Sequence, residues 1–327
     1  MARDHRFDNI KVLLIFLVVF GHLLELIADK TFSHDLYLVI YSFHMPAFVF
    51  VSGYFASWSP KKILTRLAWV YVLFQVVYIL FDNALFGNSS PIQFFTPYWL
   101  MWYMLVMVYC YCLIPFIDTA SVPRRAIILG LAVAASLLAG FDDNVGRFMS
   151  LSRLFTFLPY FIAGFYMGKS RDSLAKFEEK LGRRKPLAVV VALIAVIIAA
   201  VFVLSCDAIT PNVLFGASSY AAAGYGPLLK GALLLVATTF IALLLLATPN
   251  RRIPFVTAVG AGTLSIYILH GFIVRALSIT GLFCFSEVGN LVLALLLSVV
   301  MVLALGCKPV AKFFGTYCTG KWAERFL

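Results

Sequence analysis

The stretch IKVLLIFLVVFGHLLELI, residues 10–27, is apolar apart from one lysine, one glycine, one histidine and one glutamate. Eighteen residues in an α-helix extend about 27 Å, close to the thickness of the hydrocarbon core of a bilayer. A titratable side chain at that depth is costly, and such residues usually mark function. We therefore interpret the stretch as a transmembrane helix in which His22 serves a chemical purpose.

The rest of the chain repeats this pattern. Of its 327 residues, 62% are hydrophobic and 13% are charged, whereas a soluble domain usually has about a quarter of its residues charged. Runs of roughly 20 apolar residues predict an all-α, polytopic membrane protein with about ten spans. The predicted spans are 9–27, 36–56, 66–82, 98–117, 125–141, 153–168, 186–205, 228–248, 255–277 and 288–307. We expect a single transmembrane domain over residues 1–327, without a separate soluble domain.

The distribution of lysine and arginine predicts the orientation, because cytoplasmic loops carry an excess of both. With both termini cytoplasmic, 21 of the 26 Lys and Arg residues fall on the inner side and five remain for the outer side. Those five are Lys30, Arg147, Arg153, Lys230 and Arg275. The formal charge of +11 is then explained by membrane topology, and we expect no nucleic-acid partner.

Three histidines are predicted to lie at one depth in the membrane. His22 follows Lys11 by eleven residues, so it lies about 16 Å above that inner-end lysine. His44 lies about eight residues below the outer start of the second span, and His270 about fifteen residues up the ninth. Unrelated core histidines would have no reason to share a depth, so we expect these three to form one catalytic pocket.

His22 is the predicted general base, because Glu25 follows at i+3 and can hold one ring nitrogen. His44 and His270, with Tyr267 three residues before the latter, are the other predicted catalytic residues. Each also has a structural interpretation: a polar turn at the membrane surface for His22, and packing against a helix carbonyl for His44. His270 can likewise be a core residue.

The six cysteines lack the spacing of a metal site, and we predict no metal. Cys206 and Cys284 both fall on the predicted outer side, where a disulfide is chemically allowed. Whether they pair is left open by the sequence.

Several motifs, taken in order along the chain, resemble the acyltransferase family 3 membrane proteins. The motifs are RFDNIK at residues 6–11, GH at 21–22, FHMPAFVFVSGY at 43–54, WY at 102–103, FLPYFIAGFYMGK at 157–169 and SIYILH at 265–270. Within that family, the chain most resembles the fucose 4-O-acetylase-like members, which consist of the membrane domain alone.

The resemblance implies transfer of an acyl group, usually acetyl from acetyl-CoA, to a hydroxyl of a cell-surface sugar. Family members carry an arginine, ten residues and then a histidine in the first span; the matching positions here are Lys11 and His22. Lysine keeps the charge and loses the planar fork that grips phosphate in two places. We expect Arg6, Lys11, Lys62 and Arg66 to form a rim that binds the coenzyme A phosphates at the inner surface.

On the acceptor side, Trp102, Tyr103, Arg153 and Arg275 are the predicted substrate-binding residues. His44, Tyr267 or Arg275 would stabilise the developing oxyanion. Direct transfer and an acyl-histidine intermediate both remain open.

The expected partners are acyl-CoA, a glycan or sugar acceptor, the lipid bilayer of the cell membrane, and glycan-synthesis or export machinery. No tightly bound cofactor is expected, and succinyl-CoA is an alternative donor. Two other classes of protein also fit the composition. One is a transporter or exporter that uses the histidines as a proton relay, and the other is a structural membrane partner.

Overall fold

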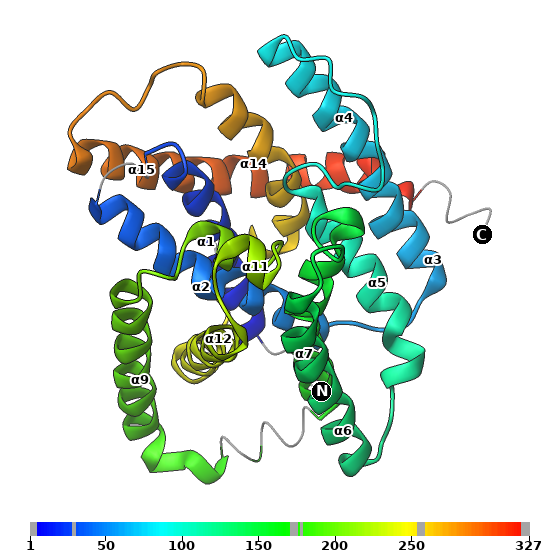
Figure 1. Cartoon of the computed structure of the whole chain (residues 1–327), viewed down its shortest axis with the longest axis vertical. Helices are drawn as coiled ribbons and strands as arrows, with labels where there is room; N and C mark the ends of the chain where they lie inside the picture. The colour runs from blue at the N-terminus through cyan, green and yellow to red at the C-terminus, as the bar shows by residue number, and fades with distance from the viewer. Residues whose placement is uncertain (1–4, 28–30, 171–175, 177–178, 254–258, 322–327) are drawn as a thin grey trace.

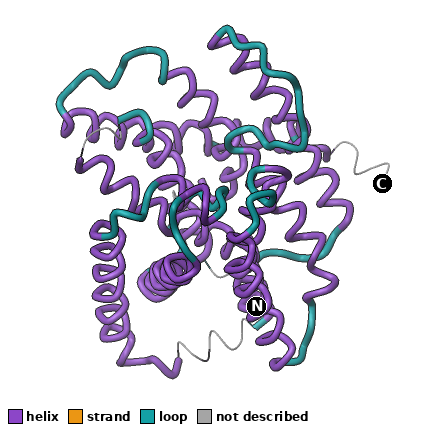
Figure 2. The backbone as a smooth tube through the Cα atoms, viewed as in Figure 1, coloured by secondary structure: helices purple, strands orange, loops and turns teal. Residues whose placement is uncertain are grey.

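A computed structural model describes residues 5–27, 31–170, 176, 179–253 and 259–321. The described residues form helices joined by loops and contain no strand (Figures 1 and 2). Eight helical segments are long and apolar enough to span a membrane. They are α1 (Arg6–Leu24); α2 (Thr31–Tyr54); the continuous run of α3 (Pro60–Lys62), η1 (Ile63–Ala68) and α4 (Trp69–Phe86); α6 (Val122–Leu138) with η2 (Ala139–Phe141); η3 (Phe148–Ser150) with α7 (Leu151–Lys169); Glu179–Ser205, which includes η4 (Gly182–Arg184) and α9 (Lys185–Ser205); α12 (Pro227–Ala247); and α15 (Glu287–Gly306).

Two shorter apolar helices, α5 (Met101–Ile117) and α14 (Thr263–Leu277), complete the ten predicted spans. The prediction of an all-α polytopic membrane protein is therefore confirmed, although residues 254–258 of the predicted ninth span lie outside the described residues. The remaining short helices are α10 (Pro211–Leu214), α11 (Tyr220–Ala223), η5 (Gly260–Gly262), α16 (Lys308–Phe313) and η6 (Phe314–Cys318).

The helix α1 lies inside the bundle and packs against α2, α14 and α15. Its apolar side chains point in all directions, which is typical of a helix surrounded by protein. By contrast, α6, α9 and α15 leave rows of apolar side chains exposed, such as Leu131, Ile198 and Leu296. These outer helices provide the lipid-facing surface, and α1 is free to carry polar groups inward.

The closest helix contact joins α2 and α7 through three glycines. A Cβ atom on Gly53 would lie 2.1 Å from the carbonyl oxygen of Phe161, and one on Gly164 would lie 1.9 Å from that of Phe50. Gly168, four residues after Gly164, approaches the carbonyl of Tyr54 in the same way. This small-xxx-small spacing lets two backbones touch, which is how many membrane helices associate. The contact fixes α7 against the helix that carries His44.

The loop before α5 is held by one buried side chain. Gln75 of α4 donates from Nε2 to the carbonyls of Gln93 and Thr96, at 2.7 and 3.1 Å, and accepts from the backbone N–H of Tyr98 at 2.8 Å. A loop held in this way can present its last residues, including Trp99, in a fixed position.

All six cysteines are free thiols in this structure. Cys206 and Cys284, whose pairing the sequence leaves open, are not bonded to each other.

Candidate active site

A cavity of about 390 Å³ lies beside the C-terminal end of α1, and we call it the outer cavity. Its walls come from α1, α2, α14, the entry to α5, the segment leading into α7, and Phe215. The lining residues are His22, Glu25, Tyr37, Tyr41, His44, Met45, Thr96, Pro97, Trp99, Leu100, Trp102, Arg147, Ser150, Arg153, Phe215 and Tyr267. A pocket of this size, with aromatic walls and a few convergent polar groups, is typical of a ligand site.

His22 is held by two oxygen atoms through a single ring nitrogen. Its Nδ1 lies 3.2 Å from Oε1 of Glu25 and 3.1 Å from the hydroxyl oxygen of Tyr41. The Tyr41 hydroxyl donates to the same carboxylate oxygen, so its own oxygen can only accept from His22. These contacts require the proton on Nδ1, which leaves the lone pair of Nε2 available. Nε2 makes no hydrogen bond to any described residue, and the side chain lines the cavity, so His22 is arranged as a general base.

The other two histidines are oriented by helix carbonyls. His44 donates from Nδ1 to the carbonyl of Ile40 at 2.8 Å, and His270 donates from Nδ1 to that of Ile266 at 2.9 Å. Their neutral forms therefore present Nε2 as an acceptor only. The ring of His270 stacks against His22 with centroids 5.4 Å apart, and its buried Nε2 has no hydrogen-bond partner in the described part of the chain. His22 and His44 line the outer cavity, whereas His270 stacks on His22 and is not one of the lining residues.

Backbone strain gathers at the same cavity. Trp99, Met149 and Ser150 are the non-glycine residues with positive φ among those described, at 31°, 50° and 53°. Trp99 and Ser150 line the cavity, and Met149 directly precedes Ser150 in the chain. Such conformations cost on the order of 1–3 kcal/mol each and cluster at functional sites. The strained backbone turns the Trp99 ring onto His22, with centroids 4.9 Å apart.

Space for the Trp99 ring depends on a glycine in α14. A Cβ atom on Gly271 would lie 3.1 Å from the Trp99 ring and 2.6 Å from Leu100. Two tyrosines fasten α14 close by: Tyr78 donates to the carbonyl of Ile268, and Tyr267 donates to the carbonyl of Leu100, both at 2.6 Å. The interface between α14 and the entry to α5 therefore sets the position of the ring.

Trp102 and Arg153, two of the four predicted substrate-binding residues, line the outer cavity. The Arg153 guanidinium lies 4.8 Å from the centroid of the Trp102 ring, and its Nε donates to the carbonyl of Phe215 at 3.1 Å. Tyr103 points the other way, and its hydroxyl is 2.7 Å from that of Ser52.

Arg275 lies outside the outer cavity and is bound by a carboxylate. Its Nε and Nη2 donate to Oδ1 of Asp82 at 2.8 and 2.6 Å, and the guanidinium lies 4.4 Å from the centroid of the Phe86 ring. Its centre is 6.0 Å from that of the Trp99 ring. The structure thus does not bring Arg275 to the substrate pocket, and it pairs with an acidic residue that reasoning from the sequence leaves without a role.

A second cavity of about 170 Å³ lies toward the other end of α1, and we call it the inner cavity. Its lining is mostly apolar but includes Lys11, Ser52, Tyr103 and Tyr267. Tyr267 lines both cavities, so the two share one wall residue. Lys11 and His22 therefore line neighbouring cavities near opposite ends of α1.

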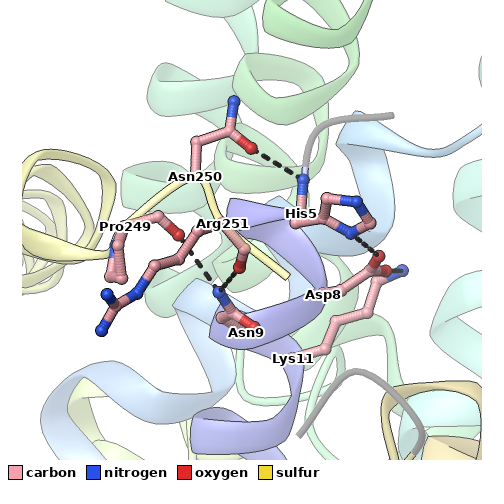
Figure 3. Close-up of polar contacts among 7 residues, drawn as sticks. All are labelled: His5, Asp8, Asn9, Lys11, Pro249, Asn250 and Arg251. Carbon is pink, nitrogen blue, oxygen red and sulfur yellow. Dashed lines mark hydrogen bonds and ion pairs between the residues drawn. The ribbon is translucent and has the colours of Figure 1, made fainter. Parts of the chain in front are cut away.

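The start of α1 is clasped by the segment after α12 (Figure 3). Asn9 donates from Nδ2 to the carbonyls of Pro249 and Arg251, both at 3.1 Å. The backbone N–H of His5 donates to Oδ1 of Asn250 at 2.9 Å. These bonds fix the helix end from which Lys11 projects.

Lys11 is placed by two neighbours. Its Nζ lies 3.9 Å from the Asp8 carboxylate, which also lies 3.8 Å from Nδ1 of His5 (Figure 3). The same Nζ lies 3.6 Å from the centroid of the Phe55 ring. An ammonium held at the rim of a cavity is suited to an anionic ligand group.

The other predicted phosphate-binding residues are in α1, α3 and η1, and none of them lines the inner cavity. Arg6 is buried in the first turn of α1, Lys62 is exposed at the end of α3, and Arg66 is partly buried in η1. The turn η1 is π-helical, with more residues per turn than an α-helix; it begins directly after Lys62 and includes Arg66. Leu67, next to Arg66, does line the cavity.

Tyr41, Trp99 and Arg147 are the site residues that sequence reasoning missed. Tyr41 lies three residues before His44 on one helical face, a spacing that could have indicated it. Trp99 looks like an ordinary residue of the aromatic belt at the membrane surface, and Arg147 like a loop cation. In the described part of the chain, no three His, Cys, Asp or Glu side chains are grouped so as to hold a metal ion.

Two comparisons with known proteins found a match. The sequence model described as "Acyltransferase domain" matches residues 4–307. The chain is 48% identical over 59 residues to nodulation protein NolL of Sinorhizobium fredii (strain NBRC 101917 / NGR234), a match that covers 17% of this chain and 16% of that protein. No solved structure matches.

Proposed function

Since this chain belongs to acyltransferase family 3, we propose that it moves an acetyl group from cytoplasmic acetyl-CoA to a hydroxyl of an exported or cell-surface glycan. Family membership makes the chain an acyltransferase and not the transporter or structural partner that its composition also allows. The eight long and two shorter apolar helices of the described residues make it a multi-pass membrane protein. The donor, the acceptor and the site are the proposed parts.

The observation that carries the proposal is the pair of cavities that share Tyr267. Lys11 lies on the inner cavity, and His22 lies on the outer one. Coenzyme A is cytoplasmic and anionic, so its phosphates would bind near Lys11 while the thioester arm enters the apolar inner cavity. The acceptor would enter the outer cavity from the opposite side of the membrane.

In the proposed step, Nε2 of His22 removes the proton from an acceptor hydroxyl. The hydroxyl oxygen bonds to the thioester carbonyl carbon, the carbon–sulfur bond then breaks, and the sulfur leaves with the proton that His22 held. Glu25 stabilises the imidazolium between these events. A route through an acetyl-histidine uses the same residue as nucleophile and stays an alternative.

Of the three groups considered for the oxyanion, we assign the role to Tyr267. His44 uses its one N–H on the Ile40 carbonyl, and Arg275 is bound to Asp82. The Tyr267 hydroxyl donates to Leu100 in the free protein, and it borders both cavities, where the thioester carbonyl would lie. It can exchange that carbonyl for the oxyanion as charge develops.

The proposed location is the cell membrane, with both termini cytoplasmic, next to glycan-synthesis or export machinery. Succinyl-CoA is the second candidate donor, because it presents the same coenzyme and thioester.

The experiment is acetyl-CoA turnover by purified protein in nanodiscs. We expect acetyl-CoA to raise the thermal midpoint and to be hydrolysed slowly to labelled acetate, and His22→Ala to lose at least about a hundredfold in rate while it keeps the stabilisation. His34→Ala, a histidine outside both cavities, is the matched control and should keep the rate. Full activity in His22→Ala would overturn the assignment of the base. If neither acetyl-CoA nor succinyl-CoA stabilises the protein or is hydrolysed, the assignment of an acyl-CoA donor is wrong.

A further inference from the structure

Two arginines of the outer cavity have no acidic partner in the part of the chain that the structure describes. Arg153 and Arg147 both line it, and neither forms an ion pair with any described carboxylate. Other basic residues of the predicted outer side are engaged elsewhere: Arg275 by Asp82, and Lys230, which donates to the Thr156 hydroxyl at 2.7 Å. Lys30 lies outside the described residues. Neither arginine of the cavity is therefore paired directly with a described acidic side chain.

Among the described residues that line the cavity, Glu25 is the one carboxylate, and it is hydrogen-bonded to the predicted base. Glu25 accepts from both His22 and the Tyr41 hydroxyl through Oε1. Two arginines against one committed carboxylate leave the cavity with a net positive charge. Charge left unpaired beside low-dielectric walls is costly, and an anionic ligand would offset that cost.

Arg153 is held so that the outer part of its guanidinium stays open. Its Nε is bonded to the Phe215 carbonyl, and its planar head lies over Trp102, which itself stacks on Phe157 at 5.2 Å. Its two terminal nitrogens make no hydrogen bond to a described residue. A fixed guanidinium with both terminal nitrogens free is the group that binds carboxylate or phosphate in two places.

The segment that carries the arginines is itself fixed at an energetic cost. Between Arg147 and Arg153, Met149 and Ser150 have positive φ, and the backbone N–H of Met149 donates to the Phe95 carbonyl at 2.6 Å. Strain of this kind persists where the surroundings hold it for function. The arrangement keeps Arg147 at the exposed rim and Arg153 inside.

We infer that the acceptor carries an anionic group, a carboxylate or a phosphate, which Arg153 binds and Arg147 attracts at the rim of the outer cavity. This inference rests on the proposed function and narrows its acceptor to an acidic glycan or sugar. The anion holds the sugar between Trp99 and Trp102 while a neutral hydroxyl of the same molecule reaches His22. The same chemistry could come from the far carboxylate of a dicarboxylic acyl group on the donor, and the test separates the two sources.

The test compares trigalacturonate with its methyl ester, which has the same ring hydroxyls and no charge. With full-length protein in nanodiscs, we expect trigalacturonate to raise the thermal midpoint and to bind at least about tenfold more tightly than the ester. Arg153→Gln should remove at least about tenfold of that affinity and Arg153→Lys should restore part of it, whereas Arg124→Gln, at the exposed start of α6, should bind like the native protein. Glucose 1-phosphate against glucose is the matching phosphate pair.

Three results would overturn the inference. One is equal or tighter binding of the uncharged member in both pairs, and another is unchanged affinity in Arg153→Gln. The third is a tenfold preference for succinyl-CoA over acetyl-CoA that Arg153→Gln abolishes, because the anion would then belong to the donor. If acetyl-CoA is hydrolysed in a His22-dependent way while any of these occurs, the proposed function stands and the acidic acceptor fails.

Discussion

Replacing Glu25 by glutamine tests the arrangement of the base without changing its shape. The carboxylate lies 3.2 Å from Nδ1 of His22, and the two side chains are 27% and 12% exposed. Two unit charges at that distance attract by about 1 kcal/mol in bulk water and about 5 kcal/mol at an effective dielectric constant of 20. The pair is partly exposed, so its attraction lies between these limits. In Glu25→Gln, the imidazolium formed in the transition state should therefore lose about 1 to 5 kcal/mol of stabilisation.

At about 1.4 kcal/mol for each factor of ten, kcat should fall by roughly tenfold to a few thousandfold. The KM for acetyl-CoA should stay within about twofold, because Glu25 does not line the inner cavity. Release of labelled acetate by purified protein in nanodiscs measures both constants, and thermal unfolding verifies the fold. Tyr41→Phe removes a hydroxyl and no charge, so its loss should be smaller. A kcat within threefold of the native value in Glu25→Gln would refute the role of the carboxylate.

Three further substitutions probe other parts of the molecule. Lys11→Ala should raise the KM for acetyl-CoA about tenfold by removing the ammonium at the inner cavity, while Lys11→Arg should be tolerated; initial rates against donor concentration decide this. Gly164→Ala should lower the thermal midpoint because its Cβ would lie 1.9 Å from a carbonyl oxygen of α2, whereas Gly231→Ala, with nothing within 4 Å, should be neutral or slightly stabilising. Comparable midpoints for the two variants would contradict that packing. Asp82→Ala should destabilise by about 2 kcal/mol, since it leaves Arg275 partly buried without its carboxylate, and the double variant Asp82→Ala/Arg275→Leu should recover much of the loss in thermal unfolding.

The spans could be predicted from sequence because hydropathy alone decides them. Ten apolar runs predict the eight long and two shorter apolar helices, and most boundaries differ by only a few residues. The predicted third span, 66–82, starts too late. Ser59 caps this helix and Pro60 begins it, before the apolar run starts. Polar caps precede the apolar residues on which the span prediction rests.

The candidate site could be predicted only where depth along a helix was enough. The rise per residue predicts one level for His22, His44 and His270; in the structure His22 and His44 line one cavity, and His270 stacks on His22 outside its lining. Depth does not specify the rotation of one helix against another, so it could not predict that Arg275 turns to Asp82. The position of Trp99 depends on a strained loop residue, which has no sequence pattern.

Tyr267 lines both cavities, and on the proposed route this gives it a part in electrical insulation. With the donor entering from one face of the membrane and the acceptor from the other, the Tyr267 ring would belong to the barrier between the two sides. The acetyl group would pass this position while the proton gradient across the membrane is held back. Tyr267→Gly should then join the cavities into a continuous wet path, and vesicles that contain the variant should dissipate an imposed pH gradient faster than native ones, whether or not acetyl-CoA is present.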